Sequence, residues 1–244
     1  VVDRTGAVTA LKVPPGFYER PRVSPDGTQL ALGSEDSTGA TIWIHDLSRD
    51  TSLRPLTFQG EGRNRFPVWS ADGTYVAFQS DREGAPAIFR QRSDGSSKAE
   101  RVTTPDKETA HQPSSWSSDG KHLLYSVSKG ATNTVWVYSF ESKKGIQLPD
   151  VETPRLASPS FSPDGKWIAY TVTTADGQNQ VFAQPFPPTG AKYLVGAGAR
   201  PLWSRSGKDI FYYRNAGTCF KTVIGTRPGL TLSNETSLPF NVVL

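Results

Sequence analysis

Five serines recur along the chain at nearly constant spacing, and a nucleophilic hydroxyl is the first chemistry that they suggest. A serine nucleophile needs a neighbouring general base and is often carried on a Gly-x-Ser-x-Gly turn, which the sequence does not contain. A residue needed at the same place five times is better explained as a hydrogen-bonding turn residue. We therefore predict structural roles for all five and no catalytic residue. The serines are Ser24, Ser70, Ser117, Ser162 and Ser204, separated by 46, 47, 45 and 42 residues.

The chain offers few residues for metal or acid-base chemistry. It has three histidines, His45, His111 and His122, and one cysteine, Cys219, none at the spacing of zinc ligands. No stretch carries the oxygen ligands of an EF-hand calcium loop. The sequence thus predicts no metal site and no cofactor. Only His111 is placed like a binding residue, because we expect it in a polar loop, residues 104–113.

The composition favours short strands joined by turns. The 244 residues include 22 Gly and 19 Pro, which is too many helix breakers for long helices. Hydrophobic residues make up 36% and charged residues 20%, as in a folded globular protein. The net charge of +4 is spread along the chain, so we predict no nucleic-acid partner. No apolar run is long enough to span a bilayer, so we predict no membrane contact by this segment.

Each serine marks the same point in a repeat whose length is close to the ~40–45 residues of a four-stranded propeller blade. An Asp-Gly turn follows, in which Asp can bond backbone amides and Gly supplies positive φ. Second strands are predicted at 29–33, 75–79, 122–126, 167–171 and 209–213. Third strands are predicted at 41–45, 87–90, 134–138 and 180–183. Fourth strands are predicted at 54–57, 100–103, 145–148 and 192–195, with another outer strand near 237–240.

A single sheet of this kind has two apolar faces, so neighbouring sheets must stack to bury them. The sequence therefore predicts an all-β fold, a β-propeller of four-stranded antiparallel blades with five repeats visible, forming a single domain over residues 1–244. Trp69, Trp116 and Trp203 are predicted to pack against neighbouring blades. The predicted repeats span about 14–57, 58–103, 104–148, 149–195 and 196–244.

Residues 1–13 are predicted to contain an outer strand, at Val8–Val13, of a preceding or shared blade. Either this strand closes the ring by completing the fifth blade, or the chain is part of a ring of six or more blades. The second alternative leaves blade faces open and predicts self-association, which sedimentation would detect.

The run Pro67-Val68-Trp69-Ser70-Ala71-Asp72-Gly73, followed by Val76-Ala77-Phe78 and Ile88-Phe89, resembles the WD-like repeats of TolB-type propellers. Such repeats also occur in prolyl-oligopeptidase-like proteins. The order of Trp167–Tyr170, Val181–Pro187 and Pro201–Ser204 resembles the C-terminal propeller of bacterial serine/threonine protein kinases. These resemblances imply a sensor or interaction module in a periplasmic or other extracytoplasmic location.

Ligands of propellers usually meet the loops that cross from one blade to the next, together with the loops between second and third strands. The crossovers are predicted at 17–22, 59–66, 104–112, 150–158 and 196–200. Cations near one rim could attract an anionic peptide or sugar. The predicted ligand-binding residues are Tyr18, Arg22, Arg63, Arg65, His111, Arg155 and Arg200.

The sequence leaves three functions open. The first is a non-catalytic sensor or scaffold that binds a protein, peptide or glycan on one propeller face. The second is the propeller of a prolyl-oligopeptidase-like hydrolase whose catalytic domain is not in this sequence. The third is a free-standing propeller hydrolase or lyase, which would need a cluster of carboxylates or histidines at the channel mouth.

Overall fold

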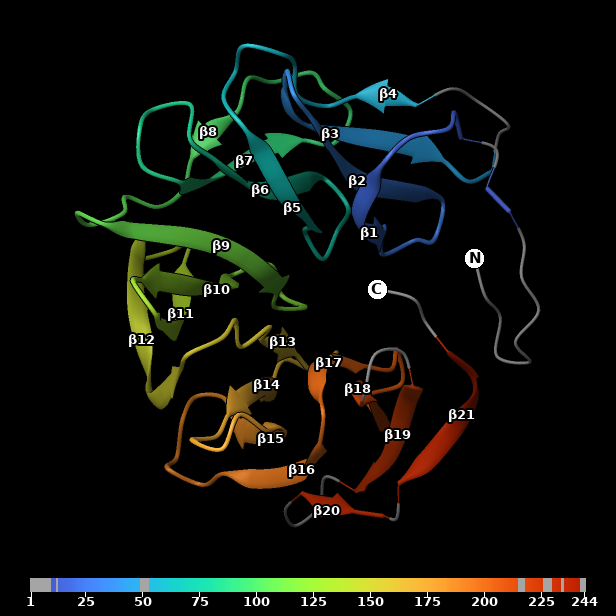
Figure 1. Cartoon of the computed structure of the whole chain (residues 1–244), viewed down its shortest axis with the longest axis vertical. Helices are drawn as coiled ribbons and strands as arrows, with labels where there is room; N and C mark the ends of the chain where they lie inside the picture. The colour runs from blue at the N-terminus through green and yellow to red at the C-terminus, as the bar shows by residue number, and fades with distance from the viewer. Residues whose placement is uncertain are drawn as a thin grey trace. The chain divides into compact units, whose positions relative to one another are not determined.

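A computed structural model describes residues 10–11, 13–48, 53–214, 218–225, 230–233 and 235–241. This part of the chain forms five antiparallel sheets, and the strands of each sheet follow one another in the sequence (Figure 1). It contains no helix, and hence none long and apolar enough to cross a membrane. Stacked four-stranded antiparallel sheets are the blades of a β-propeller, so the predicted fold class is confirmed.

The strands have the following bounds. The first sheet contains β1 (Tyr18–Val23), β2 (Gln29–Asp36), β3 (Gly39–Asp46) and β4 (Arg54–Pro55). The second contains β5 (Asn64–Trp69), β6 (Tyr75–Ser80), β7 (Ala87–Arg92) and β8 (Glu100–Arg101). The third contains β9 (Thr109–Trp116), β10 (His122–Lys129), β11 (Thr132–Ser139) and β12 (Lys144–Thr153). The fourth contains β13 (Ser160–Phe161), β14 (Trp167–Thr173), β15 (Asn179–Pro185) and β16 (Tyr193–Ala197). The fifth contains β17 (Ala199–Trp203), β18 (Asp209–Arg214), β19 (Thr218–Gly225), β20 (Thr231–Leu232) and β21 (Thr236–Asn241).

The predicted second, third and fourth strands are all present, although β4 and β8 are only two residues long. The fifth sheet gains a fifth strand, because β21 pairs with β19 in addition to β20. The predicted crossovers were too long, since the innermost strands β1, β5 and β9 begin inside them. Of the outer strand predicted at Val8–Val13, Ala10, Leu11 and Val13 are described and belong to no strand, and its other three residues lie outside the described residues.

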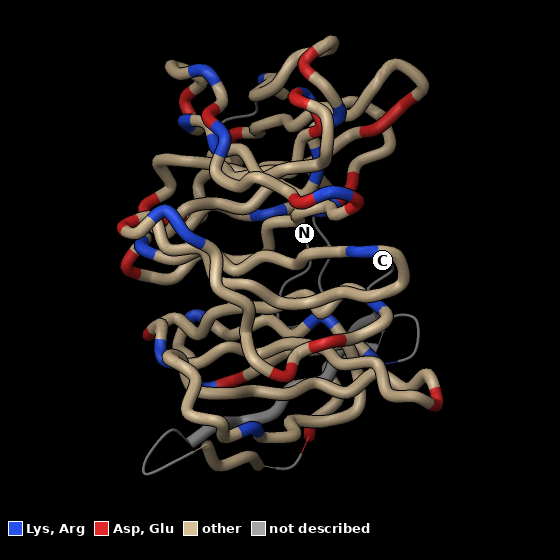
Figure 2. Tube along the Cα trace, turned by 90° about the vertical axis from the view of Figure 1, so that its left-hand side faces the viewer, with Lys and Arg blue, Asp and Glu red and all other residues tan. Residues whose placement is uncertain are grey.

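The chain divides into two compact units. The first unit comprises residues 11–130 and 137–146, and the second comprises 1–10, 131–136 and 147–244. The first unit therefore holds the first two sheets with β9 and β10, and the second unit holds the last two sheets. Charges of both signs alternate along the trace, so the surplus of +4 is not gathered in one segment (Figure 2).

The five marker serines close the turns between the first and second strands of the sheets. In the second sheet, the Ser70 hydroxyl donates to Asp72 Oδ1 at 2.6 Å and accepts the Tyr75 N–H at 2.9 Å. The Ser70 carbonyl accepts the N–H of Gly73, whose φ is 72°. Equivalent bonds form at the other four serines, with Ser206 in place of the aspartate in the fifth sheet. The predicted structural role is confirmed.

Replacing Ser70 with alanine should lower the free energy of unfolding by about 2 kcal/mol, because the Tyr75 amide loses its acceptor and the ionised Asp72 loses one of its donors. The same change at Ser204 should cost about 1 kcal/mol, since its hydroxyl meets the neutral Ser206. Urea denaturation of the two variants measures both values. Equal costs would show that the aspartate adds nothing to the turn.

Apolar side chains join neighbouring sheets within each unit. In the first unit, Ile42 and Leu56 of the first sheet pack with Trp69, Phe78 and Phe89 of the second. In the second unit, one cluster combines residues of the fourth and fifth sheets. Its members include Trp167, Ala169, Val181, Ile210 and Tyr212. The core therefore lies between the sheets, as stacking requires.

Tryptophans also join sheets through hydrogen bonds. The Trp69 Nε1–H donates to the carbonyl of Arg22 in the first sheet at 2.8 Å. The Trp203 Nε1–H donates to the carbonyl of Ser160 in the fourth sheet at 3.2 Å. Trp116 occupies the same repeat position, but its buried Nε1 has no acceptor in the described structure. Instead, its ring packs edge-on against Phe140 of its own sheet at 5.0 Å.

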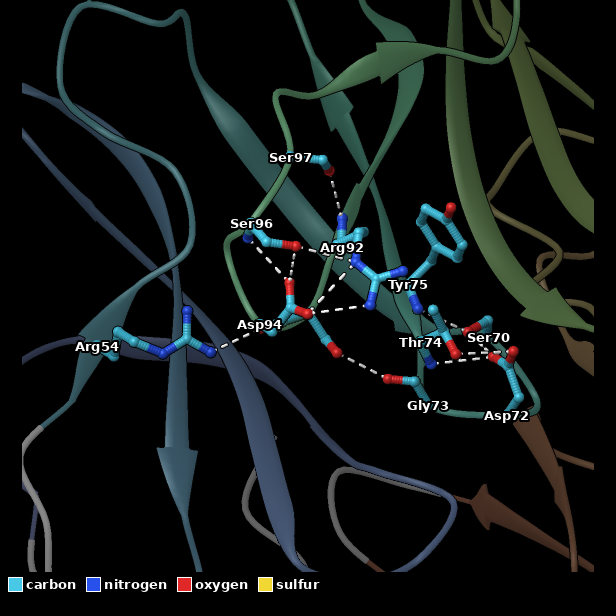
Figure 3. Close-up of polar contacts among 11 residues, drawn as sticks. Arg54, Ser70, Asp72, Gly73, Thr74, Tyr75, Arg92, Asp94, Ser96 and Ser97 are labelled. Carbon is cyan, nitrogen blue, oxygen red and sulfur yellow. Dashed lines mark hydrogen bonds and ion pairs between the residues drawn. The ribbon is translucent and has the colours of Figure 1, made fainter.

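A polar network makes a second tie between the first two sheets (Figure 3). The guanidinium of Arg54, on β4, donates to the carbonyl of Ser93 at 2.5 Å. The Ser93 hydroxyl donates to the Gly73 carbonyl at 2.8 Å, which links this tie to the serine turn. Arg92 and Asp94 form an ion pair at 3.0 Å beside it. The turn end of the second sheet is thereby fixed to its neighbour.

Candidate binding surface

The innermost strands carry a repeated backbone irregularity. The pairing register shifts within β1, β5, β9 and β17, which marks a bulge in each strand. In four repeats the residue four positions before the marker serine has positive φ and precedes a proline, which has no N–H to satisfy. These residues are Arg20, Phe66, Ser158 and Arg200, with φ values of 52°, 58°, 46° and 56°. Such strained conformations cost about 1–3 kcal/mol each and cluster at functional sites.

Two of these bulge residues contact each other across the first two sheets. The Arg20 guanidinium lies 5.6 Å from the centroid of the Phe66 ring, in a cation–π contact. Sequence reasoning did not identify either residue. The available signal was an X-Pro pair four residues before the marker serine, as at Arg20-Pro21 and Phe66-Pro67.

Arg63 and Arg65 are brought together by Glu35. Arg65 Nε donates to Glu35 Oε2 at 2.8 Å, and its Nη2 contacts Oε1, so both carboxylate oxygens are used. Arg63 lies 3.6 Å from Oε1, and its side chain is 54% exposed. Hydrogen bonding from Arg65, together with the positive charges of Arg65 and Arg63, lowers the pKa of Glu35. Glu35 is therefore ionised at neutral pH and holds Arg65 in place.

Buried contacts hold the segment that carries Arg63. Asn64 is fully buried, donates to the Gly62 carbonyl and accepts from Arg82 Nη2 at 2.9 Å. Asp81 Oδ1 accepts the Arg63 backbone N–H at 2.6 Å. A Cβ at Gly62, where φ is 82°, would lie 2.6 Å from the Arg82 backbone nitrogen. Substitution of this glycine is excluded, and the backbone under Arg63 is fixed in advance of any binding.

Arg82, which donates to Asn64, is itself held by aromatic contacts. Its guanidinium lies over the rings of Phe78 and Phe89, at 5.4 and 5.1 Å from their centroids. Burial lowers the pKa of Arg82 from its ordinary value. We call Arg20, Glu35, Arg63, Arg65 and Phe66 the crossover surface. All five belong to the first unit.

The prediction that His111 lies in a binding loop was wrong. His111 is part of β9, where it pairs with Val127, and it is 7% exposed. Its ring lies 5.3 Å from the Tyr125 ring, and burial lowers its pKa to about 4. The following polar residues resemble a loop in the sequence, but they pair with β10. His111 is therefore a neutral core residue.

The other predicted residues do not form one group. Tyr18 lies at the start of β1, and its hydroxyl donates to the Pro14 carbonyl at 3.0 Å. Arg22 lies near the opposite end of β1, next to the serine turn, and its carbonyl accepts from Trp69. Arg155 and Arg200 belong to the second unit, where Arg155 is exposed and the Arg200 N–H donates to Thr171 Oγ1.

Within the described residues, no three His, Cys, Asp or Glu side chains form a group that could hold a metal ion. The marker serines are engaged in turn hydrogen bonds, and His111 is buried. The arrangement on the crossover surface supplies cations and one aromatic ring on a rigid backbone. Its chemistry is that of binding through hydrogen bonds and charge.

Comparisons with known proteins agree with the fold. The family model described as the TolB β-propeller domain, PD40, matches residues 3–152. The uncharacterized peptidase YuxL of Bacillus subtilis is 28% identical over 197 residues, which cover 64% of this chain and 29% of the relative. The Tol-Pal system protein TolB of Francisella tularensis is 28% identical over 181 residues, which cover 72% of this chain and 40% of the relative. This chain thus spans less than half the length of either relative.

The fold is similar to that of a solved structure, a putative TolB from Agrobacterium tumefaciens, with a TM-score of 0.74 and 22% identity. That match covers 93% of this chain and 82% of the other. Sheet topology and structural similarity together define a β-propeller protein. The family match over residues 3–152 is more specific: the chain belongs to the TolB β-propeller family.

Proposed function

We propose that residues 1–244 act as a non-catalytic binding module whose crossover surface recognises an acidic segment of a partner protein or peptide. The observation that carries this proposal is the unequal sharing of Glu35. Because Arg65 occupies both of its oxygens, the exposed Arg63 retains only a long 3.6 Å contact. An incoming carboxylate can therefore form a charge-assisted hydrogen bond with Arg63 without breaking the Arg65 pair.

Three further observations support a binding role. The marker serines have structural partners, His111 is buried, and one relative is a Tol-Pal system protein. We further propose that the module is a sensor or scaffold in an extracytoplasmic location, on the resemblance of its repeats to TolB-type propellers. Such a surface could bind a protein, a peptide or a glycan. The exposed guanidinium of Arg63 favours an acidic segment of a protein or peptide among these.

A ten-residue glutamate-rich peptide with a fluorescent label tests the proposal by anisotropy. We expect binding that weakens with added salt, because the contact is between exposed charges. Arg63→Glu should reduce the affinity at least fivefold. The matched control is Lys98→Glu, an equal charge change at an exposed residue between β7 and β8, at the turn end of the second sheet. Equal losses in both variants would mean that the peptide senses only net charge.

A second function has one specific observation in its favour. The relative YuxL is named an uncharacterized peptidase, and the match covers only 29% of its length. The chain would then be the propeller of a prolyl-oligopeptidase-like hydrolase. A Gly-x-Ser-x-Gly segment encoded next to this sequence would favour the hydrolase, whereas a kinase domain encoded before it would favour the sensor.

A further inference from the structure

A pocket of about 490 Å³ lies between the fourth and fifth sheets, within the second unit. It opens beside the serine turns. The pocket shares no residue with the crossover surface, which belongs to the first unit. Its volume falls within the ~300–1,000 Å³ typical of small-molecule sites. The lining residues are Ser162, Pro163, Asp164, Trp167, Trp203, Ser206, Gly207 and Lys208.

The pocket occupies a repeat-equivalent position, but its side chains differ from those at the junction of the first two sheets. At the junction of the first two sheets, the positions of Trp167 and Lys208 are held by Gln29 and Thr74. Ser206 stands where every other repeat has an aspartate. The junction of the fourth and fifth sheets therefore gains a second indole and an ammonium group, and loses one of its two turn carboxylates.

Asp164 keeps one carboxylate oxygen available. Its Oδ1 accepts the Ser162 hydroxyl at 2.6 Å and the Lys166 N–H at 3.1 Å, whereas Oδ2 has no partner among the described residues. In the second sheet, Asp72 Oδ2 is instead occupied by the Thr74 hydroxyl at 2.8 Å. Residue 166 is a lysine, whereas the equivalent residue of the second sheet is Thr74. Lys166 has no hydroxyl group to donate to Asp164 Oδ2.

Lys208, Trp167 and Trp203 also line the pocket. Lys208 makes no ion pair within the described part of the chain. The Trp203 ring is fixed by its bond to the Ser160 carbonyl, and the Trp167 ring by edge contact with Tyr193 at 5.7 Å. The pocket thus combines a fixed indole ring with polar groups, which are the Asp164 carboxylate, the Lys208 ammonium and the Ser206 hydroxyl. This combination fits a ligand ring that has apolar faces and carries hydroxyl groups at its edge.

We propose that this pocket is a saccharide-binding site for a neutral mono- or disaccharide. The sugar ring packs its C–H face against the partly exposed Trp203 ring, which itself lies on the core cluster that contains the buried Trp167. Vicinal hydroxyls donate to Asp164 Oδ2 and accept from Lys208. A single carboxylate and a single ammonium cancel in charge, which favours a neutral ligand over an anion.

The probe is cellobiose, a neutral β-linked disaccharide, and saturation-transfer NMR on the full chain measures its binding. We expect transfer to the sugar ring protons and a dissociation constant in the millimolar range. Lys208→Ala should weaken binding at least tenfold. Ser206→Asp restores the aspartate of the other four repeats, so it should keep or raise the unfolding midpoint while abolishing binding. Thr74→Ala, the equivalent change to Lys208→Ala in the second sheet, is the control.

Loss of binding in Lys208→Ala and Ser206→Asp, but not in Thr74→Ala, supports the site. Absence of saturation transfer to cellobiose in the unmodified chain overturns the proposal. Equal binding by all variants also overturns it. Diglycine, a zwitterion, is the competitor: if diglycine shows transfer and cellobiose does not, the pocket binds peptide termini and the saccharide assignment is wrong.

Discussion

Replacing Trp69 with alanine is expected to lower the free energy of unfolding by about 3–5 kcal/mol, the usual cost of truncating a buried large aromatic residue. Trp69 is 7% exposed and packs with Ile42, Phe78 and Phe89 between the first two sheets. It also donates to the Arg22 carbonyl. The change removes both the packing and the bond, and urea denaturation measures the loss.

Phenylalanine substitutions separate the bond from the packing. Trp69→Phe leaves the Arg22 carbonyl without its donor and should cost about 1 kcal/mol beyond the lost ring area. Trp116→Phe removes an indole N–H that has no acceptor in the described structure, so it should cost less. A larger cost at Trp116 than at Trp69 would show that the hydrogen bond does not hold the sheets together.

The second large effect is a loss of stability between pH 6.5 and pH 4. The ordinary pKa of histidine is 6.5, and burial lowers that of His111 to about 4 in the folded chain. The unfolded chain therefore binds a proton in this range that the folded chain does not. Stability falls as pH decreases through the window, by about 3 kcal/mol in total. Asp106 favours the charged imidazole, and Arg101 opposes it.

The His111→Gln variant isolates this contribution. It should flatten the pH dependence of the unfolding free energy above pH 4, measured by urea denaturation at several pH values. Asp26 acts in a lower range, because the Ser24 hydroxyl and the Thr28 amide and hydroxyl lower its pKa to about 2. An unchanged slope between pH 6.5 and pH 4 in the variant would assign the effect to another group.

The fold could be predicted from the sequence because local signals repeat. The marker serine, the turn and the apolar strand after it predict the same hairpin in each repeat. Ser70 illustrates the reason, because its hydroxyl bonds both Asp72 in the turn and the first residue of the next strand. Trp69 and Trp203 were predicted to pack against neighbouring blades, and their indole N–H groups bond to neighbouring sheets.

The candidate site was much less predictable, because it depends on pairing between distant residues. Nothing in the sequence shows that Glu35 would engage Arg65, thirty residues later. His111 precedes a run of polar residues that resembles a loop but forms a bulged strand, since tertiary pairing overrides local polarity. The pocket at Trp167 and Trp203 arises only when two repeats meet.

The tryptophan joints have a consequence for how such chains change in evolution. The donors, Trp69 and Trp203, each lie one residue before the marker serine of their own repeat. The acceptors, the carbonyls of Arg22 and Ser160, each lie two residues before the marker serine of the preceding repeat. A repeat with tryptophan at this position, such as the second or the fifth, supplies the donor, and the backbone carbonyl of the repeat before it supplies the acceptor. Because the acceptor belongs to the backbone, a gene duplication of such a repeat would again place a donor opposite an acceptor at the new boundary. Copy number can then rise by a whole unit without a new kind of interface.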